Sequence, residues 1–299
     1  MTSLDTFAHL TTTTASPSAK TSNRSGSRGD VLRALRNFPY GLALAWLVLA
    51  LVLLWATVPW VFTSYDPLQG VPGGQLKAPS ALHLLGTDSL GRDLFARIVY
   101  GAVHSLSGAV AAVGVGLVVG SGIGLIAGSV RGRVDEILMR LVDVLLSIPT
   151  LLLSLSIIIL LGFGTLNAAI AVGATAIAGF ARLMRSEVVR VRNAEFVEAA
   201  FGSGGTFGKV LWRHILPNSL TSVVAYTAVQ FGWAILQIST LGFLGYGAPP
   251  PTPEWGLLIA EGRNYLATAW WLTAAPGLIV VAVVLSANRI SQSIGRSAR

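Results

Sequence analysis

Two stretches of the chain combine charged residues with glycine in patterns that could carry out chemistry. The first, at 194–220, reads AEFVEAAFGSGGTFGKVLWRHILPNSL. Its GGTFGKV segment resembles a phosphate-binding loop, in which glycines and a lysine surround a nucleotide. That loop needs glycine five residues before the Gly-Lys pair and serine or threonine after it, but Ser203 and Val210 occupy these positions. We therefore expect no cofactor on this chain, and any ATP and Mg²⁺ would have to bind to a partner.

The second stretch, LGTDSLGRD at 85–93, places Asp88, Arg92 and Asp93 close together. These residues could serve catalysis, a docking or gating surface, or an ion-paired turn that fixes the start of the next helix. Catalysis is disfavoured because no nucleophile or metal-ligand cluster accompanies them. His83 and His104 are far apart in sequence, and the chain has no cysteine, so no metal site is predicted. The structural and the docking or gating interpretations stay open.

Membrane helices must position these residues, because hydrophobic residues make up 53% of the chain and charged residues only 11%. The mean hydropathy is +0.68. Crossing a bilayer takes about 20 apolar residues at about 1.5 Å of rise per residue. Six segments meet this test and predict an all-α integral membrane protein: 41–63, 104–129, 141–163, 166–184, 220–246 and 270–289.

Small residues and prolines mark where these spans should pack closely or bend. Gly116, Gly120 and Gly124 follow one another at intervals of four and would let helix backbones approach closely. Pro149 in the third span and Pro276 in the sixth each lack a backbone donor, which favours a kink.

The basic residues predict the orientation of the spans. Of the 21 lysines and arginines, 17 fall in the N-terminus, the C-terminus and the loops after the second and fourth spans. The positive-inside rule then places both termini and the 194–220 insert in the cytoplasm. The net charge of +8 is thus a topology signal, and no nucleic-acid partner is expected. The alternate loops hold only four basic residues: Lys77, Arg92, Arg97 and Arg263.

The 194–220 insert is too polar to enter the membrane and should form two short helices. Asn193 could cap a first helix, which Gly202 would stop. Thr206 could cap a second helix, which must end or bend at Pro217 before the fifth span.

Four ordered motifs across residues 80–290 resemble permease subunits of ATP-binding cassette (ABC) importers. The sequence Glu198-Ala199-Ala200, then Gly204, then His214-Ile215-Leu216-Pro217 is similar to their EAA signature. Three further stretches resemble the C-type permease of dipeptide and oligopeptide importers in the peptide and nickel family: LGTDSLGRDLFARIVYGA at 85–102, GRVDEILMRLVDVLLSIP at 132–149 and PPPTPEWGLLIAEGRNYL at 249–266.

This resemblance implies a coupling helix at 194–204 that docks on a cytoplasmic ATPase subunit. The residues it assigns to coupling are Glu198, Ala199, Ala200, Gly204, Leu216 and Pro217. It also implies a homologous second permease, two ATPase subunits that bind ATP and Mg²⁺, and an extracytoplasmic peptide-binding protein, all at a bacterial inner membrane. Candidates for docking or gating on the outer side are Asp88, Arg92, Asp93, Trp255, Glu261 and Arg263.

Inside the spans, Gln230 and Gln237 lie seven residues apart and share a helix face. They could line a polar path or form hydrogen bonds to another helix. Arg140 and Asp143, at i and i+3, could pair with each other.

The expected organisation has four parts. Residues 1–38 form a disordered or amphipathic cytoplasmic N-terminus, 39–80 the first span and its outer loop, 81–290 the permease core, and 291–299 a cytoplasmic tail. The expected function is peptide import without catalysis by this chain. Nickel, glutathione or another small solute is the alternative substrate, and an intramembrane enzyme or an ATP-independent channel is a more distant alternative.

Overall fold

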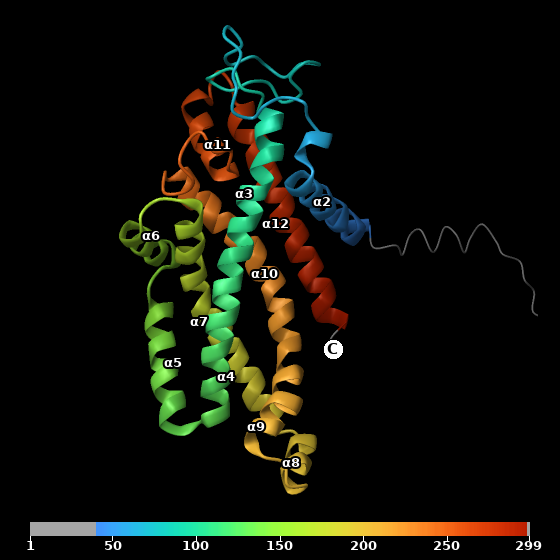
Figure 1. Ribbon diagram of the computed structural model, residues 1–299, viewed down its shortest axis with the longest axis vertical. Coiled ribbons are helices and arrows are strands. Elements are labelled where there is room, and N and C mark those ends of the chain that lie inside the picture. The colour runs from blue at the N-terminus through green and yellow to red at the C-terminus, as the bar shows by residue number, and fades with distance from the viewer. Residues whose placement is uncertain (1–39, 298–299) are drawn as a thin grey trace, which may run out of the picture. The chain divides into compact units, whose positions relative to one another are not determined.

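The computed structural model describes residues 40–297, and this part of the chain contains helices and loops but no strand. One isolated bridge joins Thr87 to Asp93. The expectations for residues 1–38 and for the last two residues fall outside the described residues. Figure 1 shows the helices, with α8 at one end and α11 at the other. We call these the α8 end and the α11 end.

Fifteen residue ranges define the helical elements in chain order. They are α2 (Tyr40–Thr57), η1 (Pro59–Val61), α3 (Leu94–Val115), the π-helix η2 (Gly116–Gly120), α4 (Ser121–Val130), α5 (Gly132–Ser147), α6 (Thr150–Leu161), α7 (Thr165–Arg192), α8 (Glu195–Gly202), α9 (Phe207–Val210), the π-helix η3 (Leu211–Ile215), α10 (Leu216–Phe243), α11 (Trp255–Gly262), η4 (Arg263–Tyr265) and α12 (Trp271–Ser297).

Among residues 40–297, five helices are long and apolar enough to cross a membrane, and a bent pair makes a sixth if it counts as one span. That pair is α5 and α6, which meet at 95°. The disturbance predicted at Pro149 is thus found at that residue, but it is a full break between two helices and not a kink within one. Ile148, before Pro149, is extended at ψ 127°, as the proline ring requires, and this breaks the helix.

The other spans lie where hydropathy predicts them, but several extend further. Helix α3 begins at Leu94, ten residues before the predicted start, because the carboxylate of Asp93 accepts the backbone N–H of Ala96 at 2.7 Å. Helix α7 continues to Arg192. Hydropathy marks only the apolar part of a helix, so polar turns beyond the bilayer stay invisible to it.

The predicted close approach of glycines is confirmed, and the partner is α7. A Cβ on Gly116 would lie 2.7 Å from the Cβ of Ala176, and one on Gly128 would lie 2.8 Å from Val188. Gly120 and Gly124 likewise face the α7 backbone. Small residues thus let the second and fourth spans pack backbone to backbone.

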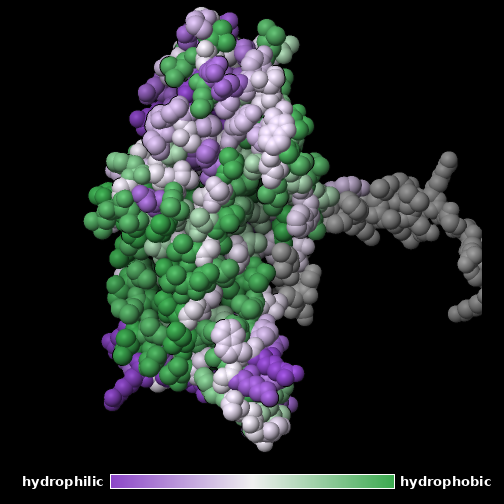
Figure 2. Space-filling view, viewed as in Figure 1, coloured by the Kyte–Doolittle hydropathy of each residue, from purple (hydrophilic) through white to green (hydrophobic). Residues whose placement is uncertain are grey.

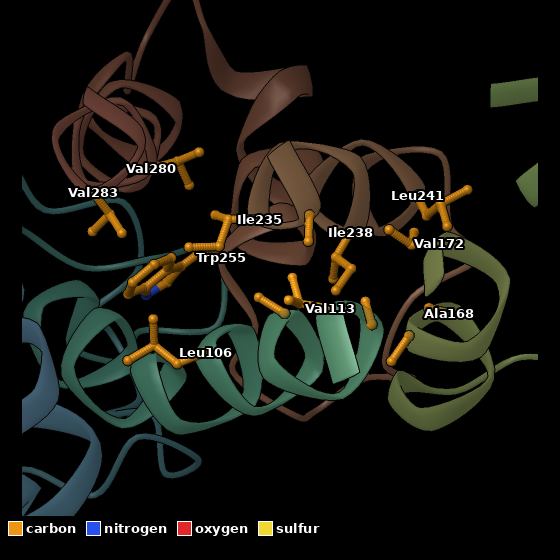
Figure 3. Packing of buried hydrophobic residues seen from close by; sticks show 14 of the residues in the cluster. Leu106, Val113, Ala168, Val172, Ile235, Ile238, Leu241, Trp255, Val280 and Val283 are labelled. Carbon is orange, nitrogen blue, oxygen red and sulfur yellow. The ribbon is translucent and has the colours of Figure 1, made fainter. Parts of the chain in front are cut away.

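Helix α10 lies at the centre of the apolar core (Figure 3). Its buried side chains contact those of α3, α7, α11 and α12. In the close-up, Trp255 of α11 projects between α10 and α3, next to Ile235 and Leu106. The labelled residues are Leu106, Val113, Ala168, Val172, Ile235, Ile238, Leu241, Trp255, Val280 and Val283.

The surface is apolar over the middle of the helices and hydrophilic mainly towards their two ends (Figure 2). Large exposed apolar side chains include Leu160 at 86% exposure and Val118 at 73%. A soluble protein rarely exposes so much contiguous apolar surface, whereas a bilayer covers it.

Candidate functional site

The 194–220 insert forms a helical projection at the α8 end (Figure 1). Helix α8 has eight residues, and the side chain of one of them, Val197, is completely buried. Glu195 and Glu198 lie in its first turn, where the helix dipole favours negative charge. The buried valine holds the helix in place, while its other face stays open.

Two consecutive glycines make the turn after α8. Gly204 has φ +83°, a left-handed conformation that costs other residues about 1–2 kcal/mol. The N–H of Gly205 donates to the carbonyl of Ala200 at 3.1 Å, and a Cβ on Gly205 would lie 2.6 Å from that oxygen. The turn therefore needs glycine at both positions for different reasons.

The capping predictions for the insert are only partly right. The cap of α8 is Ala194, without a side-chain hydrogen bond. The side chain of Asn193 instead accepts from Nη2 of Arg131 at 2.7 Å, which ties the end of α7 to the loop before α5. Thr206 does precede α9, but its hydroxyl makes no capping bond.

The second helix of the insert does not end at Pro217, so the first of the two predicted outcomes, an end or a bend, is excluded. Helix α9 continues through the π-helix η3 into α10, so that Phe207–Phe243 is one long helix. Asn218 donates from its side-chain amide to the carbonyl of His214 at 2.6 Å. The π turn and this side-chain bond let the helix pass the proline without a break.

The six residues assigned to coupling separate into two groups. Glu198, Ala199 and Gly204 are exposed on α8 and its turn, and Ala200 is half-buried next to them. Leu216 and Pro217 lie at the start of α10, where Leu216 packs against the core. A groove of about 430 Å³ separates α8 from α9, and Ala199, Lys209 and Arg213 line it.

At the α11 end, Asp88, Arg92, Arg97 and Glu261 form a buried ionic cluster. Oδ2 of Asp88 accepts from Nε of Arg92 at 2.6 Å and from Nη1 of Arg97 at 2.8 Å. Arg97 and Arg92 also donate to Oε2 of Glu261 on α11, at 2.5 Å and 3.4 Å. The cluster contains two positive and two negative charges, so it joins α11 to the start of α3 without net charge.

Asp93 has a separate structural role next to this ionic cluster. One of its oxygens caps α3, and the other lies 2.9 Å from Nδ1 of His83. Asp88, Arg92 and Asp93 are each at most 4% exposed. The geometry therefore favours the ion-paired turn, which was one of the two open interpretations of this stretch.

Trp255 was predicted on an outer docking surface, but its side chain is completely buried. Its indole N–H donates to the carbonyl of Ile98 at 3.0 Å. The predicted direct contact between this side chain and a binding protein is therefore wrong. The tryptophan packs in the apolar core instead. Arg263 is exposed, with its guanidinium 5.9 Å from the ring centre of Phe243, and Glu261 is partly exposed at 26%.

Two buried charged residues were missed from the sequence. Arg97 was counted only as a loop charge, although it follows the cap of a helix among apolar residues. Glu254 is 1% exposed and accepts the N–H groups of Gly256 and Leu257, each at 2.9 Å. The hydroxyl of Ser105 donates to it at 3.2 Å. Burial raises the pKa of Glu254, against the opposing effect of these hydrogen bonds. A glutamate directly before a helix was the signal that could have identified it.

Of the polar residues predicted within the spans, Gln230 and Gln237 keep both of their suggested roles, whereas the pairing suggested for Arg140 and Asp143 is not found. Gln237 is buried, and its side-chain nitrogen has no hydrogen-bond partner among the described residues, whereas Gln230 is half-buried. Arg140 and Asp143 do not pair with each other. Arg140 donates to Glu136 at 2.9 Å, and Asp143 accepts from Arg182 at 2.6 Å.

Within residues 40–297, no group of three His, Asp or Glu side chains could hold a metal ion.

A known protein family matches the larger part of this sequence, including the insert. The family described as "Binding-protein-dependent transport system inner membrane component" matches residues 120–299. The chain belongs to this family. It is a permease subunit of an ABC importer and a multi-pass protein of the bacterial inner membrane. Membership implies a complex with ATPase and substrate-binding partners.

Individual relatives of the permease cover most of its length. It is 38% identical to the dipeptide transport system permease protein DppC of Alkalihalophilus pseudofirmus, over 78% of this chain and 77% of that protein. It is 40% identical to the glutathione transport system permease protein GsiD of an Escherichia coli strain, over 72% and 71%. An inward-facing structure of the MetNI methionine ABC transporter shares the fold, with a TM-score of 0.58 at 17% identity over 69% of the permease and 98% of that chain.

Proposed function

We propose that this permease forms half of the translocation pathway of an ATP-driven importer of di- or oligopeptides, and that α8 receives the movement of an ATPase subunit. The observation that carries the coupling role is the continuity of the chain from α8 to α10. Helix α8 presents Glu198 and Ala199 to the outside, and a single helix, Phe207–Phe243, leads from its turn through the core. A push on α8 would thus reach the centre of the bundle.

The projection is held firmly enough to transmit force. Val197, Val210 and Ile215 are each at most 1% exposed, so α8, α9 and η3 are all anchored by buried side chains. Moving a two-state equilibrium from 1:99 to 99:1 takes about 5.5 kcal/mol of differential binding. An anchored helix can deliver this free energy to the spans, whereas a freely moving loop would dissipate it.

The remaining parts of the importer follow from this assignment. The α8 end would face the cytoplasm and two ATPase subunits, which would bind ATP and Mg²⁺, so this chain would hydrolyse nothing itself. The α11 end would face an extracytoplasmic binding protein, with Arg263 exposed towards it. A homologous second permease would complete the pathway. The basic residues that gather in alternate loops support this orientation.

The names of the relatives support a peptide substrate. One relative is named a dipeptide permease, and the glutathione permease, at 40% identity, makes glutathione the second candidate. Glutathione is itself a small peptide, so both candidates share an amide backbone and charged termini.

The test is uptake of a labelled dipeptide by proteoliposomes that contain the whole importer, its binding protein and internal ATP. Ala199→Trp adds bulk to the open face of α8 and should reduce uptake at least tenfold, while the variant still inserts. Leu278→Trp is the control, because Leu278 on α12 is 67% exposed and far from α8 in the chain. Undiminished uptake with Ala199→Trp would refute the coupling role, and absence of peptide uptake by the unaltered importer would refute the substrate.

A further inference from the structure

Asp143 of α5 and Arg182 of α7 form an ion pair at a place where charges are costly. Nη2 of Arg182 lies 2.6 Å from Oδ1 of Asp143, and the side chains are 57% and 59% exposed. Asp143 follows Gly132 by eleven residues, about 16 Å along α5. Arg182 is ten residues, about 15 Å, from the end of α7 at Arg192. Both residues therefore lie well away from these ends of the two helices.

Contact of this pair with lipid is disfavoured. A charged residue in the centre of a membrane helix costs about 2.5–3.5 kcal/mol on insertion scales, so such residues face the protein interior or a water-filled cavity. Here the pair lies in a cavity of about 720 Å³ that is wide open to the surface. Residues of α5, α7 and α10 line it, among them Asp143, Arg182 and Tyr226.

The pair leaves most of its hydrogen-bonding capacity unused. A guanidinium has five N–H donors, and one hydrogen bond to Asp143 is the only one that Arg182 makes within the described residues. Asp143 likewise uses one oxygen. The neighbouring pair differs, because Arg185 binds both oxygens of Asp135 at 2.6 Å each and so has its charge fully matched.

Tyr226 adds a neutral polar group to the cavity. Its ring is held edge-on against Phe180 of α7, with the centroids 5.0 Å apart, and its hydroxyl points at Gly179. A Cβ at residue 179 would lie 2.5 Å from that oxygen. The hydroxyl has no protein hydrogen-bond partner in the described part of the chain, so it is available to an amide.

We propose that Arg182 and Asp143 form a binding subsite for the two charged termini of a short peptide as it passes through the permease. Arg182 binds the carboxylate, Asp143 binds the ammonium group, and Tyr226 contacts the peptide amide. The bond between Arg182 and Asp143 then opens to admit the ligand. This inference rests on the proposed import of peptides and names the chemical class, a zwitterion with free termini.

The dimensions suit such a ligand. An extended dipeptide spans at most about 7 Å, which is short enough to lie between two side chains that swing apart from direct contact. The cavity falls within the roughly 300–1,000 Å³ that small-molecule sites occupy. The acid on α5 and the base on α7 also attract the two ends of a zwitterion. After the ligand leaves, the empty site carries no net charge.

The test is equilibrium binding of tritiated dialanine to the permease and ATPase complex in lipid nanodiscs, without the binding protein, so that only the membrane subsite selects. Competition with N-acetylated and C-amidated dialanine measures the contribution of each terminus. The unaltered complex should bind each blocked peptide at least tenfold more weakly than free dialanine. Asp143→Asn should remove the discrimination against the acetylated peptide only, and Arg182→Gln should remove that against the amidated peptide only.

Glu136→Gln and Arg140→Gln are matched controls, because they break an exposed ion pair on the same helix and should change each dissociation constant by less than twofold. Unchanged discrimination in the Asp143 and Arg182 variants would overturn the inference while leaving peptide import intact. Loss of complex assembly in these variants, seen by size-exclusion chromatography and basal ATP hydrolysis, would assign the pair to subunit packing and also overturn it. If the unaltered importer takes up no peptide, the proposed function fails as well.

Discussion

Nη1 of Arg97 lies 2.8 Å from Oδ2 of Asp88, and the two side chains are 0% and 5% exposed. This pair joins the first turn of α3 to the loop before it, and Glu261 extends the connection to α11. The 85–93 stretch, for which the sequence left an ion-paired turn and a docking or gating surface both open, is therefore in its interior a set of ion pairs that connects the elements of the α11 end. The contribution of such a buried pair to folding stability becomes evident mainly when one partner is removed, because the other charge is then left uncompensated.

Arg97→Met should destabilise the permease strongly. Removing one member of a buried ion pair costs about 3–5 kcal/mol, while the comparable change Arg140→Met in an exposed pair should cost at most about 1 kcal/mol. Thermal unfolding of the purified complex in detergent measures the difference. Equal unfolding temperatures for the two variants would show that the ionic cluster contributes nothing to stability.

Glu254 should make stability depend on pH. Burial raises the pKa of its carboxyl, so the folded protein holds this proton more tightly than the unfolded chain. The stability from the protonated group is then complete below the ordinary glutamate pKa and is lost as the pH rises through the raised folded value. As the pH rises through this range, the unfolding temperature of the unaltered protein should fall relative to that of the Glu254→Gln variant. A constant difference between the two proteins from pH 4 to pH 8 would contradict the raised pKa.

Gly120→Ala and Gly122→Ala should have opposite effects, although they are two residues apart. A Cβ at position 120 meets the backbone of Ile177 and the side chain of Phe180, whereas one at position 122 meets nothing within 4 Å. Overpacking typically costs about 1–3 kcal/mol, and alanine is otherwise better than glycine in a helix by about 0.5–1 kcal/mol. Unfolding temperatures should fall for the first variant and hold or rise for the second. A similar response from both would argue against close contact between η2 and α7.

Gly204→Ala should destabilise the turn after α8 by about 1–2 kcal/mol, since φ +83° is left-handed. Gly208→Ala is the control, because this residue lies inside α9 with open space around it. Hydrogen exchange of the amides in residues 195–210 reports local opening directly. The first variant should exchange faster there and the second should not. Identical exchange in both would mean that the turn does not require glycine.

Much of the fold was predictable because lipid imposes a simple rule. A span must be largely apolar, so hydropathy located five of the six predicted spans, and the spacing of Gly116, Gly120 and Gly124 predicted a close packing that η2 and α4 make with α7. The helical nature of 194–204 and its glycine turn also followed from local preferences. These features depend on neighbouring residues in the chain.

The features that sequence could not supply depend on distant residues. Asn193 pairs with Arg131 across 62 positions, and Trp255 binds Ile98 across 157 positions, so neither the absent cap nor the buried tryptophan was visible locally. The predicted pair of Arg140 and Asp143 was wrong for the same reason only at Asp143, which accepts from Arg182 of α7, whereas Arg140 pairs with Glu136 one turn back on α5. Pro149 signalled a disturbance of the helix, but the 95° angle was not visible locally, and α5 and α6 each contact the distant helix α7.

The central claim is that α8 docks on an ATPase subunit, and it can be tested by cross-linking at Ala199. The chain contains no cysteine, so Ala199→Cys carries a single attachment point for a photoreactive group on the exposed face of α8. Leu82→Cys is the control, because Leu82 is 75% exposed in the loop before α3. Illumination of the assembled importer should join the permease to an ATPase subunit from position 199 and not from position 82. An assembled complex that hydrolyses ATP yet yields no such adduct from position 199 would contradict the account.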